Sequence, residues 1–296
     1  MFIGGHVSAA GGISLAYGRA KEIGGNAVQI FSASPRVWTR KDIAQSEIDR
    51  CLQFQKELGI TKTVIHAIYL VNLASDNKEL VEKSRNCIEF DLRVDAALHG
   101  SGVVVHVGSH QGKGFEAVFD QLVHEIKIIL SNTPENSTFL IENSAGQNGK
   151  IASDLSEIRR LIDAVGSPRL GWCLDTCHAF CAGYELENSL NSPLSHQPPL
   201  TPPSEGGESK NVIEEIDRLQ LWDTLKVVHV NDSRDSFDSG RDRHENIGEG
   251  SIGDDVFRSF FSHEKIRTLP LIIEVPGIDH KSGPDKENIE RVKRLM

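Results

Sequence analysis

The feature that most constrains the fold is the regular alternation of short apolar runs with longer amphipathic segments. The runs have the length of buried strands and cover residues 2–7, 27–32, 62–67, 102–107, 138–142, 170–175, 225–231 and 270–275. The intervening segments have helical periodicity and cover 13–24, 42–58, 77–99, 115–130, 153–165, 208–222, 253–263 and 285–295. Eight strand–helix units in strict order predict an α/β fold, a single (β/α)8 TIM barrel over residues 1–296. A doubly wound open sheet is the alternative.

Local signals mark several helix boundaries. Ser153 precedes DLSEI, and Pro284 with Asp285 precedes KENIE, so helices are expected to begin there. Stop signals are Gly59, Gly100 and Gly166. One segment breaks the pattern: residues 192–207, SPLSHQPPLTPPSEGG, hold five of the 11 prolines. Because proline lacks the backbone N–H, this stretch predicts a flexible insertion in the loop after the sixth strand.

Polar residues of two types stand at the ends of the apolar runs. Six runs end on histidine, aspartate or glutamate, and a further pair follows in RDRHENIGEG. Imidazole and carboxylate without thiolate suit zinc, manganese or iron. Nine ligands are too many for one ion, so two or three ions are expected, and the chemistry they favour is phosphoester hydrolysis. The nine residues are His66, His106, Glu142, Asp175, His178, His229, Asp242, His244 and Glu274.

Their position agrees with the predicted fold, because the active sites of such barrels lie at the C-terminal ends of the strands. Two spacings add weak support. Asp175 and His178 are three residues apart, so a helical turn would place both on one face. Asp242 and His244 alternate, so an extended segment would aim both side chains the same way.

Composition limits the partners and the compartment. The net charge is -10, so no overall basic field attracts nucleic acid, and binding to DNA would need bound metal and local Arg or Lys. Five cysteines without the density of a disulfide scaffold fit a reducing cytoplasm. The first residues lack the features of a signal peptide, and no apolar run approaches the ~20 residues that span a bilayer. We therefore expect a cytoplasmic protein with no membrane association and no obligate protein partner.

At these motifs the chain resembles the endonuclease IV family, the zinc-dependent apurinic/apyrimidinic endonucleases also called deoxyribonuclease IV (phage-T4-induced). The resemblance covers nearly the whole length and is carried by GGHVSAAGG, HVGSHQGKG, IENSAGQ, CLDTCHAFCAGYEL, HVND, DRHENIGEG and LIIEVPG. It implies a TIM barrel with three zinc ions and a role in base-excision DNA repair. The implied reaction is hydrolysis of the phosphodiester 5′ to an abasic site, which leaves a 3′-hydroxyl and a 5′-deoxyribose phosphate. It also implies trimming of blocked 3′ ends.

The resemblance assigns the ligands in three sets. The first zinc would be bound by His66, His106 and Glu142. The second would be bound by Glu142, which bridges the two ions, together with Asp175, His229 and Glu274. The third would be bound by His178, Asp242 and His244. Glu142 and Glu274 are the expected catalytic carboxylates, the latter orienting the attacking water.

The expected partner is double-stranded DNA that contains abasic sites or blocked 3′ ends. By resemblance, the loop at 32–38 enters the minor groove, and Arg36 and Tyr69 are the candidate DNA-binding residues. The chain departs from the commoner family pattern at Ser34, Ile68 and Val107. These departures leave the ligand set unchanged and affect the expectation for lesion recognition.

Alternatives apply to several features. A sugar isomerase or epimerase on the same type of barrel uses one or two ions, so the third ligand set separates it from the nuclease. A catalytically silent, metal-stabilised DNA-binding scaffold is the second alternative.

Single residues also have alternative roles. His6 has a role in orienting a ligand or in packing. For Cys177 a buried, unreactive thiol is expected, and Lys113 is interpreted as a surface charge with phosphate contact left open.

Overall fold

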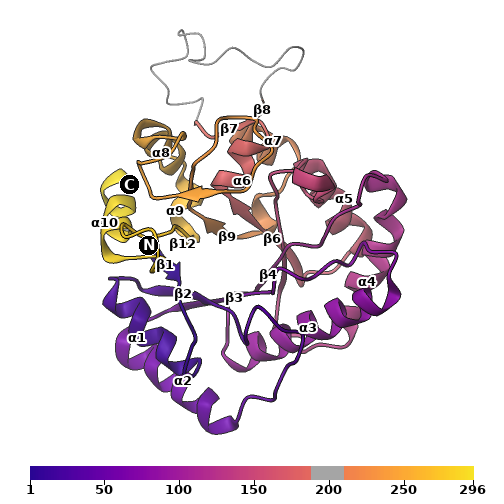
Figure 1. The fold of residues 1–296 in the computed structure, drawn as a ribbon, viewed down its shortest axis with the longest axis horizontal. Coiled ribbons are helices and arrows are strands. Elements are labelled where there is room, and N and C mark those ends of the chain that lie inside the picture. The colour runs from indigo at the N-terminus through magenta and orange to yellow at the C-terminus, as the bar shows by residue number, and fades with distance from the viewer. Residues whose placement is uncertain (188–209) are drawn as a thin grey trace.

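Eight parallel strands close into a barrel in the computed structural model, which describes residues 1–187 and 210–296 (Figure 1). The predicted α/β TIM-barrel fold and all eight predicted strands are confirmed. The barrel closes where Phe2–Gly5 pair in parallel with Pro270–Ile273. The strands are β1 (Phe2–His6), β2 (Ala27–Ile30), β3 (Lys62–His66), β4 (Val103–Val105), β5 (Phe139–Glu142), β6 (Leu170–Asp175), β9 (Leu225–His229) and β12 (Pro270–Ile273).

Helices surround the barrel, with one in every predicted helical segment (Figure 1). Most begin or end a few residues inside the predicted range, since terminal turns lack partners for their backbone groups. They are α1 (Ser14–Glu22), α2 (Gln45–Leu58), α3 (Lys78–Ala97), η1 (Phe115–Ala117) with α4 (Phe119–Ser131), α5 (Leu155–Val165), α7 (Val212–Arg218), α8 (Asp254–Phe261) and α10 (Lys286–Leu295). No helix in residues 1–187 or 210–296 is long and apolar enough to cross a membrane.

The boundary signals have mixed outcomes. Asp285 caps α10 by accepting from the backbone N–H of Asn288 at 2.9 Å. Asp154, rather than the predicted Ser153, caps α5, because its carboxylate accepts the N–H of Ser156 at 2.8 Å. Gly59 and Gly166 end their helices in the left-handed conformation, with φ of 67° and 66°. The third stop signal is wrong in detail: α3 ends at Ala97, and His99 rather than Gly100 adopts positive φ.

Several short elements are not among the predicted strands and helices, although the spacing of Asp175 and His178 indicates a helical turn where the first of them begins. They are α6 (Thr176–Cys181), α9 (Glu264–Thr268), the parallel pair β7 (Tyr184–Glu185) and β8 (Lys210–Asn211), and the antiparallel pair β10 (Asp232–Ser233) and β11 (His244–Glu245). Elements this short contain too few residues to show a hydrophobic period, so only tertiary packing defines them. The predicted insertion at 192–207 lies outside the described residues.

A compact apolar layer lies directly beneath the C-terminal ends of the strands. It takes one buried residue from each of seven strands: Ala27, Val64, Val104, Leu140, Cys173, Val227 and Ile272. The corresponding residue of β1 is Gly4, where a Cβ would lie 1.9 Å from the carbonyl oxygen of Ala27. Because side chains alternate along a strand, the residue two positions further on points the same way. This alternation positions the site described next.

Candidate metal centre

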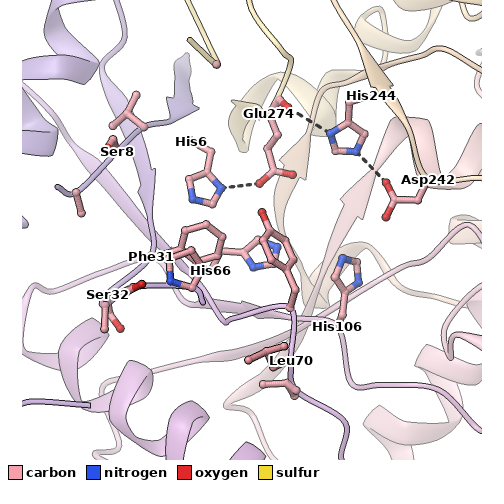
Figure 2. Close-up of a pocket in the computed structure, with 18 of the residues that line it drawn as sticks. His6, Ser8, Phe31, Ser32, His66, Leu70, His106, Asp242, His244 and Glu274 are labelled. Carbon is pink, nitrogen blue, oxygen red and sulfur yellow. Dashed lines mark hydrogen bonds and ion pairs between the residues drawn. The ribbon is translucent and has the colours of Figure 1, made fainter. Parts of the chain in front are cut away.

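One residue from each strand forms a polar ring above the apolar layer. Each member lies two positions after a member of that layer or after Gly4, at or just beyond the end of its strand. The ring consists of His6, Gln29, His66, His106, Glu142, Asp175, His229 and Glu274. Six of these are predicted metal ligands, and Figure 2 shows His6, His66, His106 and Glu274 around one cavity. Side chains of every second residue in a strand point the same way, and the eight strands are parallel in a closed barrel. Ligands far apart in the chain therefore converge on this ring.

Glu142 is buried and contacts three other members of the ring. Its Oε2 is 3.2 Å from His66 Nε2 and 3.1 Å from His106 Nε2. Its Oε1 is 3.0 Å from His229 Nδ1. Both carboxylate oxygens therefore face imidazole nitrogens on opposite sides, the arrangement that a carboxylate bridging two cations requires.

Two of the three predicted ligand sets appear as compact groups. The donor atoms of His66, His106 and Glu142 lie within 4.8 Å of one another. Those of a second group lie equally close, and this group contains Glu142, Asp175, His229 and Glu274. Glu142 belongs to both, as the resemblance implies.

Two short elements, α6 and β11, position the histidines of the third set. Asp175 is the N-cap of α6, and its Oδ1 accepts the backbone N–H of His178 at 2.8 Å. This turn points His178 into the centre, with Nε2 3.0 Å from Asp242 Oδ1. On β11, His244 Nε2 lies 3.6 Å from the same oxygen (Figure 2). His106 forms a further compact group with His178 and Asp242, so the third set adjoins the first.

Hydrogen bonds on the outer nitrogens fix the orientation of four ligand imidazoles. His66 Nδ1 lies 2.6 Å from the carbonyl oxygen of Ala67, and His178 Nδ1 lies 3.0 Å from that of Asn143. His229 Nε2 lies 2.8 Å from Gln29 Oε1. His244 Nδ1 lies 3.3 Å from the carbonyl oxygen of Glu274. Each bond leaves the other nitrogen free toward the centre, which is the usual support for metal-binding histidine.

Three supporting residues were missed by the sequence reading. Asn231 donates to Asp175 Oδ2 at 2.7 Å, and its own oxygen accepts the backbone N–H of Glu274 at 2.7 Å. Asn143 accepts the N–H of Asp175 at 2.6 Å. Gln29 donates to Glu274 Oε1 at 2.7 Å. The available signal was positional: Asn143 and Asn231 lie at the ends of predicted strands, as the ligands do, whereas Gln29 lies within one.

His6 has a definite contact in the structure. Its Nδ1 lies 2.8 Å from Glu274 Oε1 (Figure 2). Burial lowers the pKa of His6, although the hydrogen bond to Glu274 opposes that effect. A neutral imidazole with Nδ1–H donating to this carboxylate orients it. Of the two roles left open by the sequence, the contact supports orientation of a ligand.

The charges of the centre are balanced by mutual contact. Burial raises the pKa of Glu142, but the charges of His106 and His229 outweigh it and hold that pKa well below its usual range. Burial lowers the pKa of His178, but Asp175 and Asp242 outweigh it and raise that pKa to about 10. The cluster thus favours ionised carboxylates together with positive charge. Divalent cations would supply that charge and displace the protons.

The donor set fits metal ions on two observations. His244 Nε2 is buried and has no hydrogen-bond partner among the described residues, although it lies 3.6 Å from Asp175 Oδ2. A cation beside these two atoms would satisfy both. The donors are imidazole nitrogen and carboxylate oxygen, the types that zinc accepts. Cys177 forms a further compact group with Asp175 and His244, but it is buried and its Sγ lies 3.7 Å from the carbonyl oxygen of Arg243.

Six of the nine predicted ligands line a pocket of about 1260 Å³, namely His66, His106, His178, Asp242, His244 and Glu274. Loops after β1, β2 and β3 form much of its wall, including residues 31–35 and 69–72. Tyr69 lines the pocket with 68% of its surface exposed, and its ring lies edge-on to Phe31 at 5.3 Å between centroids. Arg36 is exposed in the neighbouring loop but is not among the lining residues. Ser34 lines the pocket, whereas Ile68 and Val107 are buried.

Comparisons with known proteins agree over the full chain. Residues 18–295 match the family model described as a xylose isomerase-like TIM barrel. The chain is 35% identical to a probable endonuclease 4 of Halothermothrix orenii, covering 100% of this chain and 99% of that protein. It is 36% identical to a probable endonuclease 4 of Methanoculleus marisnigri, with 100% and 99% covered.

Solved structures also match this chain over its full length. The crystal structure of endonuclease IV from Thermus thermophilus matches with a TM-score of 0.81 and 29% identity, covering 100% of this chain and 98% of that one. A D-tagatose 3-epimerase-like protein matches with a TM-score of 0.69 and 17% identity, covering 100% and 95%. At that identity, the second match shows a shared fold only.

Proposed function

This chain belongs to the endonuclease IV family, and on that premise we propose that it is a metal-dependent DNA-repair endonuclease. Its proposed reaction is hydrolysis of the phosphodiester 5′ to an abasic site, leaving a 3′-hydroxyl and a 5′-deoxyribose phosphate. Trimming of blocked 3′ ends would use the same site. The observation that carries the proposal is Glu142, whose two oxygens face His66 and His106 on one side and His229 on the other.

The proposed cofactor is three zinc ions. The first would be bound by His66, His106 and Glu142, and the second by Glu142, Asp175, His229 and Glu274. The third would be bound by His178, Asp242 and His244. Zinc supplies Lewis acidity and lowers the pKa of bound water from ~15.7 to ~7. Each of the three sets has at least one member in the lining of a single pocket, which supports this assignment.

The side chains have separate proposed tasks. Glu142 holds two positions of the centre at a fixed separation, because both of its oxygens are engaged. Glu274 orients the attacking water, and His6 and Gln29 restrict its carboxylate by hydrogen bonds to Oε1 at 2.8 and 2.7 Å. Such fixed groups raise the rate by positioning reactants before the reaction begins.

Tyr69 and Arg36 are the proposed DNA contacts. An abasic site leaves a gap in the base stack, and an exposed aromatic ring beside the pocket has the shape to fill it. Stacking on an aromatic ring contributes about 1–3 kcal/mol per base. Tyr69→Ala is therefore expected to weaken binding to an abasic duplex by a corresponding amount, as measured by fluorescence anisotropy. Equal binding by the variant would remove Tyr69 from lesion recognition.

The partner in this proposal is double-stranded DNA, and no obligate protein partner is required. We also propose a cytoplasmic location. The five cysteines, all buried and none in a disulfide, are compatible with a reducing compartment.

The direct test uses a duplex oligonucleotide with one stable abasic-site analogue. The zinc-loaded protein is expected to make a single cut 5′ to the lesion, and Glu142→Gln is expected to make none. Gel electrophoresis against size markers, followed by extension with a polymerase, locates the cut and identifies the 3′-hydroxyl. Failure of the zinc-loaded protein to cut would defeat the proposal, and ketose or sugar-phosphate substrates would be tested next.

A further inference from the structure

The wall of the central pocket contains a basic side chain. Among the described residues that line it, Lys150 is the one lysine or arginine. The other ionisable lining residues include Asp242, Glu274 and the ligand histidines. The chain as a whole has a net charge of -10. Among the described residues of the pocket wall, a polyanionic substrate therefore meets a single basic side chain.

Backbone contacts hold Lys150 in place. It follows the turn η2 (Gln147–Gly149), and its N–H donates to the carbonyl oxygen of Gln147 at 3.1 Å. An isolated antiparallel bridge joins it to Ser109, on the loop after β4. Ser144 donates to its carbonyl oxygen at 3.4 Å. The base of the side chain is therefore fixed from three sides.

The ammonium group lies next to the third ligand set. Lys150 Nζ is 3.2 Å from Asp242 Oδ2, while Asp242 Oδ1 faces His178 and His244. The side chain is 30% exposed. An ammonium has three donors, and the contact with Asp242 engages one of them. The remaining donors are available to a group in the pocket.

We propose that Lys150 is a substrate-binding residue whose ammonium contacts a non-bridging phosphate oxygen of the DNA beside the third ligand set. The inference rests on the proposed function, because it takes the phosphodiester as the ligand. Asp242 lines the same pocket, so its carboxylate would repel a phosphate bound beside it. The Lys150 ammonium, 3.2 Å from that carboxylate, offsets this repulsion and can donate a charged hydrogen bond.

A purely structural role makes a different prediction. If Lys150 only holds Asp242 in position, its removal would loosen the third ligand set and reduce the metal content. If it contacts phosphate, removal would weaken DNA binding and leave the metal content unchanged. Lys113 provides the matched control. It carries the same charge on the neighbouring loop, pairs with Asp76 and is absent from the pocket lining.

The test compares Lys150→Met, Lys150→Arg and Lys113→Met in the zinc-loaded protein. Affinity for a nicked product duplex with a 5′ abasic-analogue phosphate is measured by anisotropy over a series of salt concentrations. A charged hydrogen bond corresponds to about ten- to hundredfold in affinity. Lys150→Met is expected to weaken binding by that factor. It is also expected to reduce the slope of log affinity against log salt concentration by about one, the value for one phosphate contact. Lys150→Arg is expected to retain most of the affinity, and Lys113→Met to match the wild type.

Two results would overturn the inference. One is unchanged affinity and salt dependence in Lys150→Met, and the other is loss of zinc from that variant by elemental analysis. Failure of the proposed function is separable, because it appears as a wild-type protein that does not cut the intact abasic duplex. In that case, binding of inorganic phosphate that weakens in Lys150→Met but not in Lys113→Met would still support a phosphate site. Equal phosphate binding by the two variants would reject it.

Discussion

The barrel contains two kinds of buried carboxyl group, and they behave in opposite ways. Glu142 and Glu274 lie in the candidate metal centre, where contacts with histidine hold the pKa of each below its usual range even though burial raises it. Asp91 and Asp95 lie on α3, and burial raises the pKa of each to about 7. Glu142 is as fully buried as Asp91 and Asp95, and Glu274 is partly buried, so burial alone does not explain the difference.

The difference comes from the partners. Asp91 accepts a hydrogen bond from the hydroxyl of Ser32, and Asp95 accepts the backbone N–H of Gly102 at 3.0 Å. Neutral donors stabilise a buried carboxylate less than positive charge does. Glu142 instead faces imidazoles on both sides. A carboxyl whose direct hydrogen-bond donors are neutral keeps a raised pKa, whereas one in direct contact with imidazoles remains charged and can bind a cation.

Glu142→Gln tests the carboxyl group of the metal centre in this comparison. The amide keeps the size of the side chain but removes the charge that both ligand sets share. Cleavage of an abasic duplex is expected to fall by about 10²–10³-fold or more, the scale on which loss of one stabilising group acts. Circular dichroism is expected to show a retained fold. Activity within about tenfold of the wild type would remove Glu142 from the mechanism.

His6→Ala would sharpen the comparison, because it removes a partner rather than a carboxylate. Glu274 would keep its charge but lose the hydrogen bond at 2.8 Å that orients it. Loss of such a supporting contact reduces metal affinity or activity by about 10–100-fold. Steady-state kinetics on the abasic duplex, with zinc content measured in parallel, would show the effect. His6→Asn, which restores a donor, is expected to recover part of it, and a purely packing role would give no such recovery.

The sequence predicts the metal centre better than it predicts these supporting contacts. Apolar runs that end on His or carboxylate mark His66 and Glu142 as ligands, because few other roles place such groups at the end of a buried strand. His6 and Gln29 occupy the same position in β1 and β2, but one residue in a glycine-rich strand and one uncharged amide give no comparable signal. The sequence predicts Asp242 and His244 as ligands, but it does not predict the strand pair that positions His244.

Asp91 and Asp95 show where the sequence is misleading. Both lie within the helical pattern of 77–99, where charged side chains are expected to face solvent. Both are buried, because α3 packs its acidic positions against the loop after β2 and the start of β4. That packing depends on partners distant in the chain. Lys150 was missed for a similar reason, since nothing in GQNGKIAS indicates that its side chain lines the pocket.

Asp95→Asn tests the other side of the comparison, and its expected effect is on the pH dependence of stability. The pKa of Asp95 is about 7 in the folded protein and about 3.9 when unfolded. Between these values the folded state holds the extra proton, so the free energy of unfolding decreases as pH rises from about 4 to 7. This slope is at most about 1.4 kcal/mol per pH unit. The asparagine variant is expected to lose that contribution.

Urea titrations of both proteins at several pH values would measure it. The informative quantity is the difference in slope with pH, because the amide also changes hydrogen bonds by an amount that does not depend on pH. Parallel curves for the two proteins would show that the Asp95 carboxyl is ionised throughout and would remove it from the comparison. Asp254→Asn, at an exposed position in the first turn of α8, provides a control without a buried carboxyl.

The pairing of β1 with β12 also joins the two ends of the chain at the candidate metal centre. His6 lies near the N-terminus and Glu274 directly follows the strand that closes the barrel, and their side chains meet at 2.8 Å. A chain that stops before β12 lacks both the closing strand and Glu274. The contact that orients this carboxylate therefore exists only in a closed barrel, so the candidate centre is complete only after the last strand has been made.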